Sequence, residues 1–171
     1  PILRSAFDRV LGATDNHVFC YVNADIILLH DFLETVRAID IRRFFMAGQR
    51  WDLDVEFAID FERPQWECEL VDYAGSHGQW HPPYGSDYFV FSRDSQLCAL
   101  PPFAVGRAGW DCWFIYRARS LGIPVIDATS SVRPIHQNHD YGHVPKVSGA
   151  TSDGTDWTGP ETELHRSLIG D

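Results

Sequence analysis

The sequence has little basic charge, few cysteines and no long apolar run. Its 14 Lys and Arg residues face 24 Asp and Glu, which gives a formal net charge of −10. The chain contains no basic patch, and this argues against nucleic acid as a partner. No stretch of about 18 apolar residues is present, so we expect no membrane span. The four cysteines form no C-x-x-C pair, which excludes zinc-ribbon and thioredoxin-like motifs.

The cysteine positions and the first residues also bear on the compartment. Cys20 and Cys112 fall within apolar strand and helix patterns, and we predict that both are buried free thiols. Residues 1–5 carry no secretory signal pattern. Together these features predict a reducing, cytoplasmic location.

The apolar content is that of a folded domain. Of the 171 residues, 44% are hydrophobic and 13% aromatic, which argues against disorder. We predict one domain over residues 1–147, followed by a flexible C-terminal tail over 148–171 that is rich in Gly, Ser, Thr and Asp. A short helix over 161–168 closes the predicted tail.

Helical and strand patterns alternate along the chain. This alternation predicts a single layered α/β/α domain with a mostly parallel central sheet. Apolar periodicity and Gly, Pro and capping signals predict helices over 2–11, 31–40 (with an Asp31–Glu34 capping box), from Pro64 to near Gly75, and 109–121, and strands over 17–23, 44–48, 53–57, 86–91 and 124–128.

The apolar run of residues 18–29 carries two polar side chains, Asn23 and Asp25, at its centre. They are two residues apart, so on an extended strand they project to the same face. A buried carboxylate is costly unless it is paired or holds a cation. Asp25 therefore either caps a turn or the next helix, or delivers an oxygen ligand to a metal at the carboxyl end of a strand.

Two further acids stand beside apolar elements. Asp87 opens the strand of residues 86–91, where it either satisfies loop amides or binds a ligand. Asp111 lies in the first turn of the predicted helix 109–121 and follows Trp110. It either stabilises the helix dipole or acts as a general base, and the tryptophan face could hold a ring-shaped substrate.

Three histidines fall within residues 136–143, in a segment that is predicted to be a loop. The spacing of His136 and His139 does not match a zincin helix. These side chains either face solvent or add nitrogen ligands to a divalent ion that a carboxylate holds.

Together these residues resemble the nucleotide-sugar-dependent glycosyltransferases of the GT-A type (family 2-like), over roughly residues 1–145. The segment Asn23-Ala24-Asp25 stands where that family carries an Asp-x-Asp-like motif at a strand end. The resemblance implies that Asp25 binds Mn²⁺ or Mg²⁺, which holds the nucleotide diphosphate. It also implies that His136 or His139 completes the metal shell.

The same resemblance assigns the substrates and the base. It implies a nucleotide-sugar donor and a hydroxyl acceptor, with Asp111 as the catalytic base of an inverting reaction. Asn23, Asp87 and Trp110 would then contact the substrates. The implied activity is metal-dependent glycosyl transfer.

The chain departs from the family pattern in two ways. Asn23 replaces the usual first Asp, and only the helix 2–11 precedes the metal-binding strand. Family members have further βα units there to hold the nucleotide, so the resemblance implies a fragment or a reduced version. If a partner chain supplies the missing strands, a homodimer is expected.

Two other functions remain open. One is a catalytically silent fragment or relic that binds sugar or nucleotide weakly. The other is a metal-dependent phosphoesterase that uses Asp25, Asp87 and the histidine cluster, although that class requires ligands for two metals. The acidic stretch 52–62 is interpreted as a solvated face.

Overall fold

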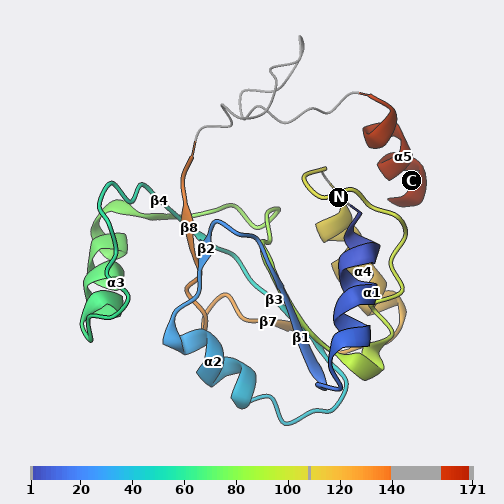
Figure 1. Ribbon diagram of the computed structural model, residues 1–171, viewed down its shortest axis with the longest axis horizontal. Coiled ribbons are helices and arrows are strands. Elements are labelled where there is room, and N and C mark those ends of the chain that lie inside the picture. Colours follow the sequence, from blue (N-terminus) through green and yellow to red (C-terminus); the bar gives the residue numbers. More distant parts are fainter. Residues whose placement is uncertain (1, 108, 140–158, 170–171) are drawn as a thin grey trace.

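The computed structural model describes residues 2–107, 109–139 and 159–169. Figure 1 shows a mixed α/β arrangement in which helices flank two small sheets. Its helices are α1 (Leu3–Ala13), α2 (His30–Arg37), α3 (Trp66–His77), α4 (Trp110–Ser120) and α5 (Pro160–Ile169), with a 3₁₀ turn η1 (Arg93–Ser95). Its strands are β1 (Val18–Val22), β2 (Ile26–Ile27), β3 (Phe45–Ala47), β4 (Trp51–Leu53), β5 (Gln79–Trp80), β6 (Tyr88–Ser92), β7 (Val125–Asp127) and β8 (Ile135–Gln137).

The first sheet has the strand order β1-β6-β3-β7. Strand β6 pairs antiparallel with both β1 and β3, whereas β3 and β7 are parallel. The α/β class is thus present, but the expected mostly parallel central sheet is not. Helix α2 connects the parallel strands β1 and β3 and leaves one position open between them. Strand β6 occupies this position and runs antiparallel to both neighbours, after residues 48–87 have formed other elements. The hydrophobic pattern of a strand does not specify its direction.

The second sheet has the order β2-β8-β4-β5. Its strands β2, β4 and β8 follow β1, β3 and β7 along the chain, so this sheet lies beyond the carboxyl ends of those three strands. Strand β8 is antiparallel to β2 and parallel to β4. The start of β6 lies at the same end, because the Asn23 backbone N–H donates to the Asp87 carbonyl at 2.9 Å. This end of the first sheet gathers the polar residues described below.

The core divides between the two faces of the first sheet and one face of the second. Alternate residues of β6 serve the two faces of the first sheet: Phe89 and Phe91 pack towards α1 and α4, and Tyr88 and Val90 towards α2. The view in Figure 1 agrees, since α1 and α4 lie on one side of this sheet and α2 on the other. Burial on both faces explains the continuous apolar run. Helix α3 covers the second sheet through Leu70 and Ala74.

Most predicted elements occur with shifted bounds. The predicted helix 109–121 is α4, and the strand predicted over 53–57 instead covers Trp51–Leu53. The segment at His136, predicted as a loop, belongs to β8. The Asp31–Glu34 capping box is absent, because the N-cap of α2 is Leu29 without a side-chain cap and Asp31 Oδ2 instead accepts the Arg133 backbone N–H at 3.0 Å.

Two thiols differ from the prediction. Cys20 and Cys112 are exposed, and Cys98 is the buried one. Strand β1, which carries Cys20, is the last strand at its end of the described sheet.

The predicted tail is described only in part, since residues 148–158 lie outside the described residues. Its helix α5 packs on α4, and His165 Nε2 accepts the Ala104 backbone N–H at 2.7 Å. Among the described helices, none is both long and apolar enough to cross a membrane.

Candidate metal centre

Asp25 lies in the turn between β1 and β2. The Ile26 backbone N–H donates to the Asn23 carbonyl at 3.3 Å, which closes this turn. Asn23 and Asp25 therefore do not share a strand face as predicted, because the strand ends at Val22. The Asp25 carbonyl accepts the Gln137 backbone N–H at 3.0 Å, so the turn is fixed to β8.

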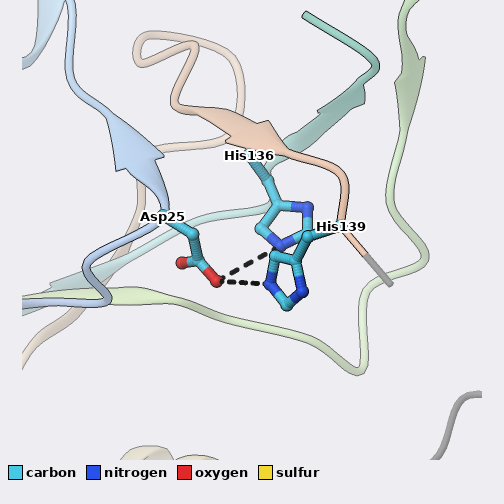
Figure 2. Close-up of side chains that lie close together, drawn as sticks. All are labelled: Asp25, His136 and His139. Carbon is cyan, nitrogen blue, oxygen red and sulfur yellow. Dashed lines mark hydrogen bonds and ion pairs between the residues drawn. The ribbon is translucent and has the colours of Figure 1, made fainter. Parts of the chain in front are cut away.

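Strand pairing brings the histidines to this carboxylate. His136 pairs with Ile26 in the antiparallel register, one residue from Asp25. Figure 2 shows both imidazole rings turned towards the Asp25 carboxylate. The Asp25 Oδ2 atom lies 3.1 Å from His139 Nε2 and 3.5 Å from His136 Nε2. The structure therefore joins the three residues that the sequence predicted as metal ligands.

The donor set fits a divalent cation. Asp25, His136 and His139 each offer one ligand atom, and these atoms lie within 4.8 Å of one another. The second carboxylate oxygen, Asp25 Oδ1, is buried and has no hydrogen-bond partner among the described residues. A buried carboxylate oxygen without a partner is costly. A cation bound by this carboxylate would remove that cost.

The electrostatics keep His136 in the form that binds metal. The side chain is buried, and burial lowers its pKa, as does the positive charge of Arg50. The charges of Asp25, Asp87 and Asp52 act in the opposite direction, with a smaller effect. A metal ligand must be the neutral imidazole, so the lowered pKa favours binding near neutral pH.

A second group of polar side chains lies directly behind the histidines. Arg50 forms ion pairs with Asp52 and with Asp87, and its side chain is only 13% exposed. His81 Nδ1 lies 2.7 Å from Asp52 Oδ2. Burial raises the pKa of Asp52, but the His81 hydrogen bond and the Arg50 charge outweigh it, so the pKa is lowered overall.

Asn23 and Asp87 extend this group towards β1. The Asn23 Oδ1 accepts the Tyr21 hydroxyl at 2.9 Å, and its Nδ2 donates to Asp87 Oδ1 at 2.5 Å. The other Asp87 oxygen pairs with Arg50. Asn23 and Asp87, two of the three residues predicted to contact substrate, thus direct their polar side-chain atoms to partners within the protein. Their described contacts connect β1, β3–β4 and β6.

Asp111 lies in the first turn of α4, as predicted. The helix begins after Gly109, which adopts the left-handed φ of 93° that favours glycine. Burial raises the pKa of Asp111, and the negative charge of Asp87 adds to this effect.

Trp110 packs into the hydrophobic core at the start of α4. Its side chain is 7% exposed, and its ring lies 5.0 Å from that of Tyr21 and 5.3 Å from that of Phe89. This burial indicates core packing, and a substrate-binding role for Trp110 stays a prediction. Its neighbours anchor the start of α4 to the end of β1.

Sequence reasoning missed Arg50, Asp52 and His81. Asp52 was included in a stretch interpreted as solvated, yet its side chain is 15% exposed. A signal was available, because Arg50 and Asp52 flank the apolar Trp51 and share a strand face by the same two-residue spacing. Their burial, however, depends on pairing with β8, which is distant in sequence.

Comparisons of the chain with protein-family models, with curated proteins and with solved structures found no match. The residues of the site therefore carry the functional argument.

Proposed function

We propose that this protein transfers a glycosyl group from a nucleotide-diphosphate sugar to a hydroxyl acceptor, with a divalent cation. The observation that carries the proposal is the convergence of Asp25, His136 and His139 on one point. This convergence supports the ligand set that the family resemblance implies. The resemblance itself remains a hypothesis, and so does the assignment as an enzyme.

The donor atoms favour one of the two predicted cations. Mg²⁺ prefers oxygen ligands in strict octahedral geometry and keeps several waters. Imidazole nitrogen suits later divalent metals, and carboxylate suits Mn²⁺. With two imidazoles and one carboxylate, we propose Mn²⁺ as the working cation.

The chemistry of glycosyl transfer assigns a task to each group. Departure of the diphosphate builds negative charge on the leaving group and oxocarbenium character on the sugar. A divalent cation held by Asp25, His136 and His139 would supply Lewis-acid stabilisation of that leaving group. Asp111 would take the proton of the acceptor hydroxyl. Burial raises its pKa, which is the direction that makes a carboxylate a stronger general base.

A cytoplasmic setting forms part of the proposal. All four cysteines are free, and Cys20, Cys68 and Cys112 are exposed. Exposed free thiols persist in a reducing compartment.

Thermal unfolding tests the donor and cation together. The melting temperature is measured with Mn²⁺ plus UDP or GDP, for the wild type and for Asp25→Ala. A ligand at about 100 times its Kd adds about 2.7 kcal/mol to stability. We expect a nucleotide-dependent rise that Asp25→Ala abolishes. A rise that persists in Asp25→Ala would contradict the proposed site.

Two further measurements distinguish the alternatives: melting temperature with sugar alone, and a phosphoester hydrolysis assay. Stabilisation by sugar without nucleotide would favour a silent relic, and hydrolysis of a generic phosphoester would favour a phosphoesterase. A two-metal phosphoesterase has less support, because the nearby Asp52 and Asp87 are already paired with Arg50.

Turnover tests the base. A positioned general base contributes about 10²–10⁴-fold to rate, so we expect Asp111→Asn to lose activity on that scale while Mn²⁺ binding is retained. Full activity in Asp111→Asn would remove this residue from the mechanism.

A further inference from the structure

Asp52 lies next to the Nδ1 atom of His136, on the opposite side of the ring from the proposed cation site. The two residues are paired in the parallel register of β4 and β8. On one side of the ring, His136 Nε2 lies 3.5 Å from Asp25 Oδ2. On the other side, Nδ1 lies 3.2 Å from Asp52 Oδ1 and 3.3 Å from Asn138 Oδ1. Because β8 lies between β2 and β4, the ring is held between two carboxylates.

Asp52 is itself fixed in place. Its Oδ1 accepts the Arg50 Nε–H at 2.9 Å, and its Oδ2 lies 2.7 Å from His81 Nδ1. Arg50 is in turn anchored on Asp87. A carboxylate that is paired with a guanidinium can only accept hydrogen bonds. Asp52 Oδ1, which lies 3.2 Å from His136 Nδ1 as an ion-pair contact, is therefore a fixed acceptor beside Asn138 Oδ1, to which this nitrogen is hydrogen-bonded.

We infer that Asp52 is a positioning residue that keeps the proton of His136 on Nδ1 and so turns the Nε2 lone pair towards the cation site. The inference rests on the proposed metal centre. Metal-binding histidines commonly donate their other ring N–H to a carboxylate, which fixes the tautomer and the ring orientation. In the opposite tautomer, an Nε2–H would point at Asp25 and remove one ligand from the site.

The tautomer can be read directly in the wild-type protein. In metal-free, ¹⁵N-histidine-labelled full chain, long-range ¹H–¹⁵N correlation spectra distinguish a protonated ring nitrogen from an unprotonated one. We expect His136 to be protonated at Nδ1, the form that is less populated in free histidine. Protonation at Nε2 would overturn the inference. This measurement requires no variant and no bound metal.

Mn²⁺ affinity, measured by water-proton relaxation, tests the consequence. Replacing an outer partner of a metal ligand costs about 10–100-fold in affinity, so we expect Asp52→Asn to weaken Mn²⁺ binding on that scale. The matched control is Asp54→Asn, which makes the same charge change at an exposed position and should bind like the wild type. Asp52→Glu keeps the acceptor and should recover part of the loss.

The outcomes separate the inference from the proposed function. Mn²⁺ binding that depends on Asp25 but is equal in Asp52→Asn and Asp54→Asn would refute the positioning role and leave the metal centre standing. A weaker Asp52→Asn with an unchanged His136 tautomer would also refute it, because the loss would then be structural. A wild type that binds no Mn²⁺ would refute the metal centre, and the His136 tautomer in the wild type and in Asp52→Asn would then decide the positioning role.

Discussion

The buried guanidinium of Arg50 gives the sharpest stability prediction. It pairs with Asp52 and Asp87, and the three side chains are 13%, 15% and 11% exposed. Arg50→Met keeps most of the side-chain volume but leaves two buried carboxylates without their cation. Removing one partner of a buried ion pair costs about 3–5 kcal/mol. For a chain of this length, each kcal/mol shifts the melting temperature by roughly 2–4 °C, so we expect a fall of roughly 6–20 °C.

Urea unfolding in the presence of a chelator is the assay, because it yields the free energy without a metal contribution. The control is Arg42→Met. Arg42 Nε lies 2.7 Å from Asp94 Oδ2, but the two side chains are 82% and 39% exposed. An exposed pair of this kind contributes about 0–1 kcal/mol. Equal losses in Arg50→Met and Arg42→Met would refute the reasoning, because the Arg50 pairs are buried and involve two carboxylates, whereas the Arg42 pair is exposed and involves one.

A second substitution tests the cause of the loss. If the unpaired charge of Asp87 is responsible, Arg50→Met combined with Asp87→Asn should recover part of the stability. Contacting residues show coupling energies of about 0.5–3 kcal/mol. Strict additivity of the two single losses would show that the pair does not interact through charge.

Three other substitutions probe the core and the proposed base. Phe114 is fully buried, so urea unfolding of Phe114→Ala should show a loss of about 3–5 kcal/mol in the free energy of unfolding. The control is Phe61→Ala, whose side chain is 58% exposed and whose loss should be about 0.5 kcal/mol or less. The Tyr88 hydroxyl is buried without a partner among the described residues, so Tyr88→Phe should unfold at equal or higher urea concentration. The pKa of Asp111 is raised in the folded protein. The wild type is therefore most stable at pH values below the unfolded-state pKa of this carboxyl, and it loses that stability as the pH rises through the folded-state pKa. Asp111→Asn should therefore gain stability relative to the wild type as the pH rises above about 4, and a difference that stays constant with pH would contradict this.

Local pattern was enough to predict the helices. Helix α4 covers Trp110–Ser120 within the predicted range 109–121, because the flanking Gly109 and Gly122 both adopt positive φ and end the apolar periodicity. The direction of β6 was beyond local pattern. An apolar run fits a strand of either direction, and pairing with β1 and β3 decides it.

The sequence predicted only those site residues whose type is unusual for their local sequence. Asp25 and His136 were predicted because a carboxylate in an apolar run and clustered histidines both require an explanation. Asp52 was missed because its burial depends on its alignment with His136 across β4 and β8. That alignment joins segments distant in sequence, and no spacing rule within either segment reveals it.

The charges around the site predict that Asp25→Asn changes the stability of the protein in opposite directions with and without a bound metal ion. Asp25, Asp52 and Asp87 are three carboxylates and Arg50 supplies one guanidinium, so with His81, His136 and His139 all neutral a charge of −2 remains. In metal-free protein, Asp25→Asn removes one of these charges, and its amide can donate to His136 Nε2, a hydrogen bond worth about 0.5–1.5 kcal/mol.

We therefore expect urea unfolding in chelator to show Asp25→Asn as stable as the wild type or more so, by about 1 kcal/mol. With saturating Mn²⁺ the order should reverse, because only the wild type gains from binding. A variant less stable than the wild type in chelator would mean that Asp25 supports the fold rather than a cation. A site kept at the expense of stability in the empty protein is a signature of function, and the reversal measures that expense directly.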